Sequence, residues 1–230
     1  MLGGTVNKAS GNWYVLSIYK LEALYQLAVM LNGLMRTPKV EALHRLINWF
    51  NALEKYPIIT PLGLDNSAVS SNYWLAGLLD ADGSFGITFL LNSIGIAIDV
   101  DLVMRLSQRQ LYHLESSLGV SYLAIMTLIA DFLNTNLIPY KRQRSGVRVE
   151  LGYIIRVKSL VSRLALINYL SEYPLMSGKR MDYNSWLEAH YLVTDKLHKT
   201  PRGTAKLTAL KSGMNTGRTT FDWSHLGDYK

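Results

Sequence analysis

The chain has no cysteine and no long apolar run, and both absences narrow its chemistry. Without thiols it cannot carry a disulfide scaffold, a thiolate nucleophile or a zinc site built on cysteine. The longest uncharged stretch, between Asp82 and Asp99, contains glycine, serine and asparagine and falls short of the roughly 18 apolar residues of a membrane span. We therefore expect no membrane segment.

Residues 1–10 are too polar for a signal peptide and lack the arginine of a transit peptide, so we expect a protein that stays where it is made or is made inside an organelle.

Charged residues are few, but the positive ones are concentrated. They make up 18% of the chain, too little for a disordered polyampholyte, and the 49% of hydrophobic residues suffices for a packed core. The formal net charge is +7, and residues 196–230 carry seven basic and two acidic groups. Four more basic residues, Lys141, Arg142, Arg144 and Arg148, lie within eight positions. Such clusters are typical of polyanion binding, although a solvated surface with a flexible tail would give the same counts.

The hydrophobic pattern predicts an α+β fold, which mixes helices with antiparallel strand pairs. From residue 71 onward the predicted order is helix, two strands, helix, two strands and helices. The predicted helices are 72–82, 121–134, 159–171 and 179–195, and the predicted strands are 84–91, 97–108, 137–143 and 147–157, with a hairpin turn at Ser145-Gly146.

The N-terminal part resembles the second half of that unit. Residues 13–20 predict a strand, and 21–31 and 38–53 predict helices, the second with Pro38 at its first position. The stretch YVLSIYKLEAL aligns with YIIRVKSLVSR further along the chain, which indicates an internal repeat. We therefore predict four parts: 1–55, a remnant of a first repeat that lacks its first half; 56–70, a linker; 71–195, a complete repeat; and 196–230, a basic C-terminal tail.

The most informative stretch is WLAGLLDADG, Trp74 to Gly83. In a helix, Gly77 and Ala81 share a face, and small residues at that spacing let two helix backbones approach closely. The helix then ends in two carboxylates, where the helix dipole disfavours negative charge, so the pattern predicts a compensating cation. Asp80 and Asp82 are two residues apart and do not face each other, so only one is the main ligand. An ordinary helix with an Asp-Gly cap would explain a scattered Asp-x-Asp-Gly, but not the whole string.

The string resembles the signature of LAGLIDADG homing endonucleases and their maturase relatives, and departs from it only at Leu79, where the family has isoleucine. Four further stretches resemble two-motif organellar members of the family: Arg36–Trp49, 121–134, Tyr173–Tyr183 and Ser212–Leu226. The resemblance therefore covers about residues 11–226. It implies an αββαββα repeat whose antiparallel sheet binds double-stranded DNA. It also implies an intron-encoded, site-specific DNA endonuclease, mitochondrial rather than chloroplast.

The resemblance also assigns the catalytic residues. Asp82 stands at the motif position that binds Mg²⁺, with the backbone carbonyl of Ala81 as a further ligand, and Asp80 ties down the helix end. Magnesium prefers such oxygen ligands and can activate water. Gln108 near the end of the second strand and Lys179 at the start of the last helix take catalytic positions, and Lys39 is the equivalent lysine of the first repeat. Without the resemblance, a lone lysine or glutamine is more simply a surface residue.

Polar residues along the strands are the candidates for DNA contacts, because an antiparallel sheet can lie in the major groove. They are Thr88 and Asn92 on the first strand, Arg105, Ser107 and Arg109 on the second, and Lys141, Arg142, Arg144, Arg148 and Arg156 on the hairpin. Many of them would contact phosphates, which position DNA without reading its sequence.

Only one acidic motif helix is found, whereas a two-motif enzyme needs two. Three explanations stay open: the first motif lies upstream in a longer protein, another copy of the chain supplies it, or the gene is decaying and retains binding without cleavage. The main alternative function is a maturase that binds its own group I intron RNA, because RNA binding does not need two metal sites. A structural protein that has reused the fold is a third hypothesis.

Overall fold

The computed structural model describes residues 3–10, 14–111, 120–143 and 149–229. It divides into two compact units, Met1–Ser67 with Leu111–Ile125, and Ala68–Gln110 with Met126–Lys230. Arg144, Arg148 and the turn predicted at Ser145-Gly146 lie outside the described residues. In the described part of the chain, no helix is both long and apolar enough to cross a membrane.

The second unit contains the predicted succession of helices and strands. Its elements are η1 (Val69–Ser71), α3 (Trp74–Asp82), β3 (Gly83–Leu91), β4 (Ala97–Arg109), α4 (Leu123–Phe132), β5 (Leu137–Gln143), β6 (Val149–Val157), α5 (Leu160–Glu172), α6 (Lys179–Thr194), η2 (Leu197–Lys199), α7 (Pro201–Ser212), η3 (Asn215–Gly217) and η4 (Ser224–Tyr229). The strands form one antiparallel sheet in the order β3-β4-β6-β5. The predicted α+β architecture with an antiparallel four-stranded sheet is therefore confirmed.

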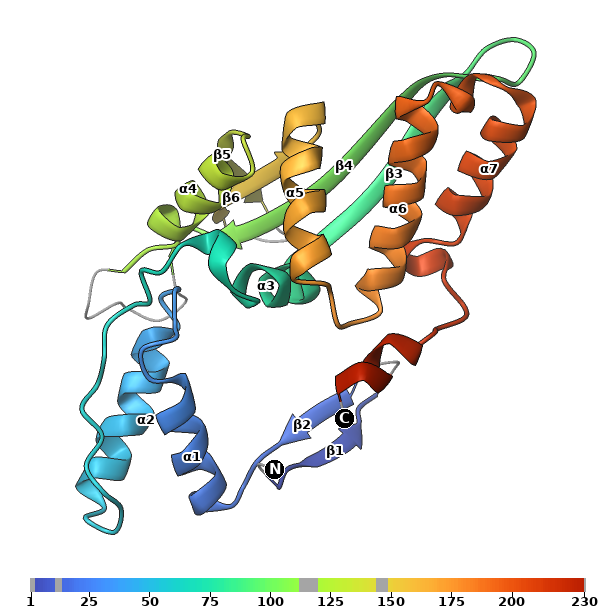
Figure 1. Ribbon diagram of the computed structural model, residues 1–230. Coiled ribbons are helices and arrows are strands. Elements are labelled where there is room, and N and C mark those ends of the chain that lie inside the picture. Colours follow the sequence, from blue (N-terminus) through green and yellow to red (C-terminus); the bar gives the residue numbers. More distant parts are fainter. Residues whose placement is uncertain (1–2, 11–13, 112–119, 144–148, 230) are drawn as a thin grey trace. The chain divides into compact units, whose positions relative to one another are not determined.

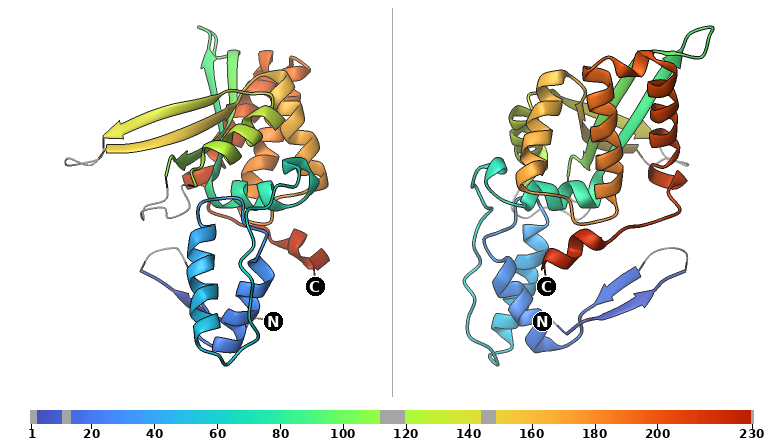
Figure 2. Two further views of the ribbon diagram at one scale, coloured as in Figure 1. Left: turned by 90° about the vertical axis from the view of Figure 1, so that its left-hand side faces the viewer. Right: turned by 45° about the vertical axis from the view of Figure 1, so that its right-hand side comes forward.

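The two faces of the sheet differ in burial. On one face, Phe85, Leu102, Met104, Leu106 and Ile155 are at most 2% exposed. Helices α5 and α6 lie over this face, as Figure 1 shows, and Leu166 and Trp186 from these helices are fully buried. Side chains alternate along a strand, so residues one position away point to the opposite face. Figure 2 shows strands β5 and β6 extending past the helices, and Lys141, Arg142 and Gln143 at the end of β5 are exposed.

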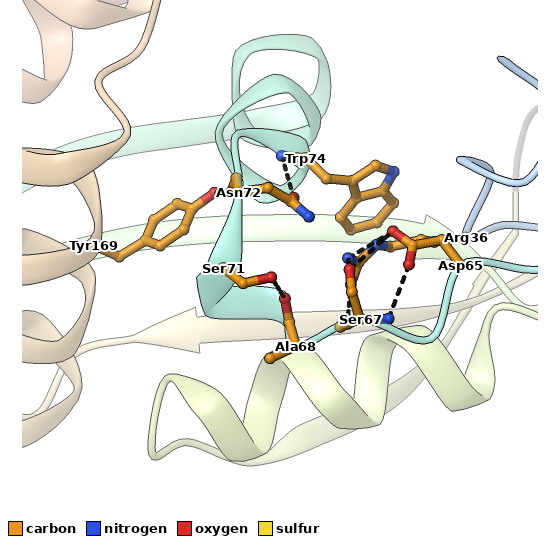
Figure 3. A network of polar contacts seen from close by, with 8 residues as sticks. All are labelled: Arg36, Asp65, Ser67, Ala68, Ser71, Asn72, Trp74 and Tyr169. Carbon is orange, nitrogen blue, oxygen red and sulfur yellow. Dashed lines mark hydrogen bonds and ion pairs between the residues drawn. The ribbon is translucent and has the colours of Figure 1, made fainter. Parts of the chain in front are cut away.

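The N-terminus of α3 is fixed by a tyrosine from α5. The hydroxyl of Tyr169 accepts a hydrogen bond from the backbone N–H of Ala76 (2.9 Å) and donates one to the carbonyl of Asn72 (2.8 Å). The Asn72 side-chain oxygen accepts from the N–H of Trp74 (3.0 Å), as Figure 3 shows. These bonds satisfy N–H groups that the first turn of a helix leaves unpaired. They hold the motif helix at a defined distance from α5.

The C-terminal part is more ordered than its composition indicates. The prediction closed the repeat at residue 195 and treated 196–230 as a basic tail, but α7 forms within it. Thr200 caps this helix by accepting from the N–H of Gly203 (3.0 Å), Pro201 occupies its first turn, and Leu207 is fully buried. Residues 201–212 of the predicted basic tail are therefore helical.

The first unit is a β-hairpin followed by two helices. Strands β1 (Thr5–Lys8) and β2 (Tyr14–Ser17) pair antiparallel, and α1 (Leu21–Leu31) and α2 (Val40–Ala52) follow. Its core contains Ala28, Leu43, Ile47 and Ile59. Three details differ from the sequence prediction: β1 was not predicted, β2 is shorter than 13–20, and Pro38 precedes α2 by two residues instead of starting it.

The predicted linker is tied to this unit by a buried arginine. Arg36 is 4% exposed, and its Nη2 lies 2.7 Å from the carboxylate of Asp65. Its Nη1 donates to the carbonyl of Ser67 (2.8 Å), as Figure 3 shows. Hydrogen bonds from Ser67 and the charge of Arg36 lower the pKa of Asp65. Linker residues 57–67 are therefore hydrogen-bonded to the rest of the first unit along their length.

Candidate metal and nucleic-acid site at the end of α3

Helix α3 runs directly into strand β3, and the glycine of the motif makes this possible. Gly83 is the first residue of β3. A Cβ atom at this position would lie 2.6 Å from the carbonyl oxygen of Leu79, which is backbone and cannot move aside. Because the helix ends without a connecting loop, its last three residues sit at the start of the sheet.

Asp80 holds this helix end to the loop before α6. Its Oδ2 accepts from the N–H of Met176 (2.7 Å), and its Oδ1 accepts from the hydroxyl (2.6 Å) and the N–H (3.2 Å) of Ser177. Both carboxylate oxygens are therefore engaged within the protein. This is the holding role that the resemblance implies for Asp80.

Asp82 is exposed and is paired with Gln108. The Nε2 of Gln108 donates to Oδ2 of Asp82 across 2.7 Å. Gln108 stands on β4 opposite Tyr153 and shares the helix-covered face with Leu106, so it points toward the end of α3. Two of the predicted catalytic residues, 26 positions apart, are thus brought into contact.

Lys179, the first residue of α6, provides a positive charge at the same helix end. Its Nζ donates to the carbonyl of Ala81 (2.8 Å) and more weakly to that of Leu79 (3.4 Å). A cation here complements the negative end of the helix dipole and binds the carbonyl of Ala81 in the last turn, whereas the Leu79 carbonyl also accepts from the N–H of Gly83. Burial lowers the pKa of Lys179, while the charges of Asp82 and Asp80 act in the opposite direction. The compensating cation predicted for this helix end is therefore, at least in part, a side chain of the protein itself.

The oxygen atoms here fit a hard cation that is shared with a substrate. Asp82 offers a carboxylate, and the Ala81 carbonyl has two lone pairs, so it can bind Lys179 and a metal together. Within the described residues there is no cluster of three or more His, Asp or Glu side chains that could hold a metal by itself. Mg²⁺ commonly binds through one or two carboxylates, keeps several waters and completes its shell with substrate phosphates. The donor set therefore fits a divalent cation such as Mg²⁺ whose shell is completed by a bound phosphate, rather than a closed protein cage.

Six of the predicted DNA-contacting residues share the sheet face opposite α5 and α6. Arg105 pairs with Ser84 on one side and with Arg156 on the other, which places all three on that face. The members of this set are Thr88, Arg105, Ser107, Arg109, Arg142 and Arg156, and all are exposed. We refer to them as the basic face. Its cations and hydroxyl groups are what a sugar-phosphate backbone and base edges require.

The remaining predicted residues are placed differently. Lys141 pairs with Leu151, and the alternation of β5 directs it to the other side of the hairpin from Arg142. The side-chain oxygen of Asn92 accepts from the N–H groups of Ile94 and Ile96, so it shapes the β3–β4 turn. Lys39 is the exposed N-cap residue of α2 in the first unit.

Sequence reasoning missed the residues that position the site. Ser177 fixes Asp80 and Tyr169 fixes the start of α3, but neither was singled out. Ser177 lies in the stretch YPLMSGKR, which carried the family resemblance, so that motif held the signal. Tyr169 lies 93 residues from its partner Ala76, and no local pattern marks it.

Comparisons with known proteins identify the family. A family model described as LAGLIDADG endonuclease matches residues 75–190, half of the chain. The intron-encoded DNA endonuclease aI3 of Saccharomyces cerevisiae is 31% identical over 97% of this chain and 59% of its own length. The chain therefore spans about three fifths of that relative.

Two solved structures show the same fold. The I-SmaMI LAGLIDADG homing endonuclease bound to cleaved DNA has a TM-score of 0.64 at 19% identity, covering 94% of this chain and 79% of that one. I-SmaMI bound to uncleaved target DNA in the presence of calcium ions has a TM-score of 0.58 at 20% identity, covering 92% and 79%. The resemblance seen in the motif is thus confirmed over most of the sequence. This chain belongs to the LAGLIDADG endonuclease family.

Proposed function

We propose that this chain is part of an intron-encoded, site-specific DNA homing endonuclease that makes double-strand breaks with Mg²⁺. We further propose that its gene lies in a mitochondrial genome. The observation that carries the proposal is the meeting of Asp82, Gln108 and Lys179 at the end of α3, where the sheet with the basic face begins. A carboxylate, a polar partner and a cation in one place suit hydrolysis of a phosphodiester.

Each of these residues has a separate task. The carboxylate of Asp82 and the carbonyl of Ala81 would hold Mg²⁺, which when bound supplies a route to activate water and to neutralise the leaving oxygen. Gln108 fixes the orientation of the Asp82 carboxylate through their hydrogen bond. Lys179 places its ammonium group beside this position and can stabilise charge that develops on the phosphate. The basic face positions the duplex over the site.

We propose that a second LAGLIDADG helix packs against α3. The motif face with Gly77 and Ala81 is exposed, and a Cβ atom on Gly77 would meet nothing within 4 Å. Packing within the described chain therefore does not require a glycine there, whereas close approach of another helix would. That helix would come from an upstream part of a longer protein or from another copy of the chain.

We also propose that the first unit is the second half of an earlier repeat. Its order of hairpin, α1 and α2 is that of β5, β6, α5 and α6, and the aligned sequences agree with this correspondence. Lys39 at the start of α2 then takes the place of Lys179 at the start of α6. We therefore assign Lys39 to the second active site of the assembled enzyme.

The proposal is tested by cleavage of DNA that spans the intron-insertion junction. The purified chain is incubated with this DNA and Mg²⁺ beside Asp82→Asn and beside Asp195→Asn, a change of an exposed carboxylate at the far end of α6. We expect the wild type and Asp195→Asn to cut at least one DNA strand, Asp82→Asn to cut neither strand, and all three to bind DNA equally. If the wild type cuts nothing but accelerates splicing of its intron RNA, the chain is a maturase and the endonuclease proposal is wrong.

A further inference from the structure

Helix α7 and the residues after it are fixed to the sheet at several points. The buried hydroxyl of Thr204 accepts from the N–H of Ala97 at the start of β4 (2.9 Å) and donates to the carbonyl of His198 (3.0 Å). Further on, the Nδ2 of Asn215 donates to the carbonyl of Phe85 on β3 (3.1 Å). Since β3 is an edge strand, this bond covers part of an otherwise open edge.

A buried ion pair secures the same segment to α6. Asp182 is 8% exposed, and its Oδ1 accepts from the N–H of Asn215 (3.1 Å) and lies 2.7 Å from Nη2 of Arg218. Residues 211–216 therefore hold one position beside β3 instead of moving freely. Their side chains can act as part of a preformed surface.

This placement brings Lys211 next to the basic face. Its Nζ lies 5.2 Å from the centroid of the Phe89 ring, and Phe89 belongs to the helix-covered side of β3 because it pairs with Val100. Lys211 lines an open hollow of about 440 Å³ together with Ser84, Thr88, Arg105, Asn215 and Thr216. Thr88 and Arg105 belong to the basic face, so the hollow continues that surface past the edge of the sheet.

The chemistry of the hollow suits a phosphodiester. Two cations, Lys211 and Arg105, and three hydroxyl-bearing residues line it beside the apolar Phe85, Ile87, Val103 and Met214, and none of its lining residues is acidic. The nearest carboxylate in the strand register, Asp101 opposite Thr88, is neutralised by Lys158 at 2.7 Å. Hydroxyl groups, amides and cations around one position are the usual partners of phosphate oxygens.

We propose that residues 211–216 form a backbone-binding element that holds a DNA phosphate at the outer edge of β3, with Lys211 as its cation. This inference rests on the proposed function, since it takes duplex DNA as the ligand. It assigns to the C-terminal segment a contact that adds affinity without reading sequence, because a lysine binds phosphate as a point charge.

The test measures binding of the full chain to fluorescein-labelled duplex DNA of two unrelated sequences over a range of salt concentrations. Loss of one phosphate contact should weaken binding about five- to tenfold for both sequences and lower the slope of log K against log salt by about one. We expect this of Lys211→Gln, whereas Lys211→Arg keeps the wild-type slope. The matched control is Lys206→Gln on the same helix, because Lys206 is already paired with Glu188 at 2.8 Å.

The outcomes separate this inference from the proposed function. If the wild type binds both duplexes and Lys211→Gln has the wild-type slope, the inference is wrong and the proposed function stands. If the wild type binds neither duplex, both are overturned. An effect of Lys211→Gln on structured RNA but not on duplex DNA also overturns the inference. Because Lys211 is exposed, circular dichroism of each variant will match that of the wild type.

Discussion

Gln108 donates a hydrogen bond to Asp82 across 2.7 Å, and this contact joins the end of strand β4 to the end of helix α3. The strand fixes Gln108 through its pairing with Tyr153 on β6, and the helix end is fixed by Asp80 and Lys179. The carboxylate is therefore oriented by Gln108, on a helix end that is itself fixed, before any ligand arrives. A site with its donors already in place loses less entropy when the substrate binds.

Replacing Gln108 should slow cleavage without weakening DNA binding. In Gln108→Met the side chain keeps its length but cannot donate to Asp82, so the carboxylate loses its fixed orientation. Partners of this kind contribute about 10- to 100-fold in metal affinity or activity. The check is single-turnover cleavage at saturating DNA, with Gln143→Met at the end of β5 as the control. Wild-type rates for Gln108→Met would show that the contact does not serve catalysis.

Gly83→Ala should destabilise the second unit. The added Cβ would lie 2.6 Å from the Leu79 carbonyl oxygen, so the joint between α3 and β3 must shift. Such strain costs about 1–3 kcal/mol of unfolding free energy, measured by urea denaturation. The control is Gly86→Ala three residues later, where the nearest atom is Cγ1 of Val103 at 3.5 Å, an ordinary contact. Equal stability of the two variants would contradict the close-packed joint.

Gly77→Leu should leave the stability of the chain intact but block the packing of a second motif helix on α3. A Cβ at Gly77 meets nothing within 4 Å, so the isolated chain should keep its unfolding free energy or gain up to about 1 kcal/mol from the better helix former. If another motif helix packs on this face, the same change should abolish double-strand cleavage and co-purification of the partner helix. Retention of full cleavage by Gly77→Leu would rule out close helix pairing at this position.

The elements that the sequence predicted well have a turn signal or a distinctive motif beside them. Strand β5 has the predicted bounds, and α3 begins two residues later than predicted, at Trp74, whose N–H donates to the side chain of Asn72. Strand β1 was missed because its four residues, TVNK, include one apolar side chain and are all exposed. Helix α7 was missed because its basic residues obscure Leu207, which alone among its leucines is fully buried.

The residues of the site differ in whether the sequence alone could identify them. Helix geometry and the dipole indicated a cation at the helix end and one main ligand among Asp80 and Asp82, and the family resemblance selected Asp82. Gln108 and Lys179 came from the family resemblance, because nothing in their local sequence marks them. Partners distant in sequence, such as Ser177 for Asp80 or Asp65 for Arg36, depend on tertiary packing, which no window of residues encodes.

His190 should make the stability of the second unit depend on pH. It is 2% exposed, is stacked on Trp186, and within the described residues its Nδ1 has no hydrogen-bond partner. Burial, reinforced by the charge of Arg163, lowers the pKa of His190 in the folded state. The unfolded chain, with a histidine pKa of about 6.5, then takes up a proton before the folded one does.

The stabilisation from His190 is therefore fully present above its unfolded pKa and declines as the pH falls from about 7 to 5. His190→Gln should flatten this part of the curve of unfolding free energy against pH. Ile155→Val, a core change without a titratable group, should lower stability by a similar amount at every pH in the window. The measurement is urea unfolding at each pH, and an unchanged slope in His190→Gln would show that another group controls the acid sensitivity.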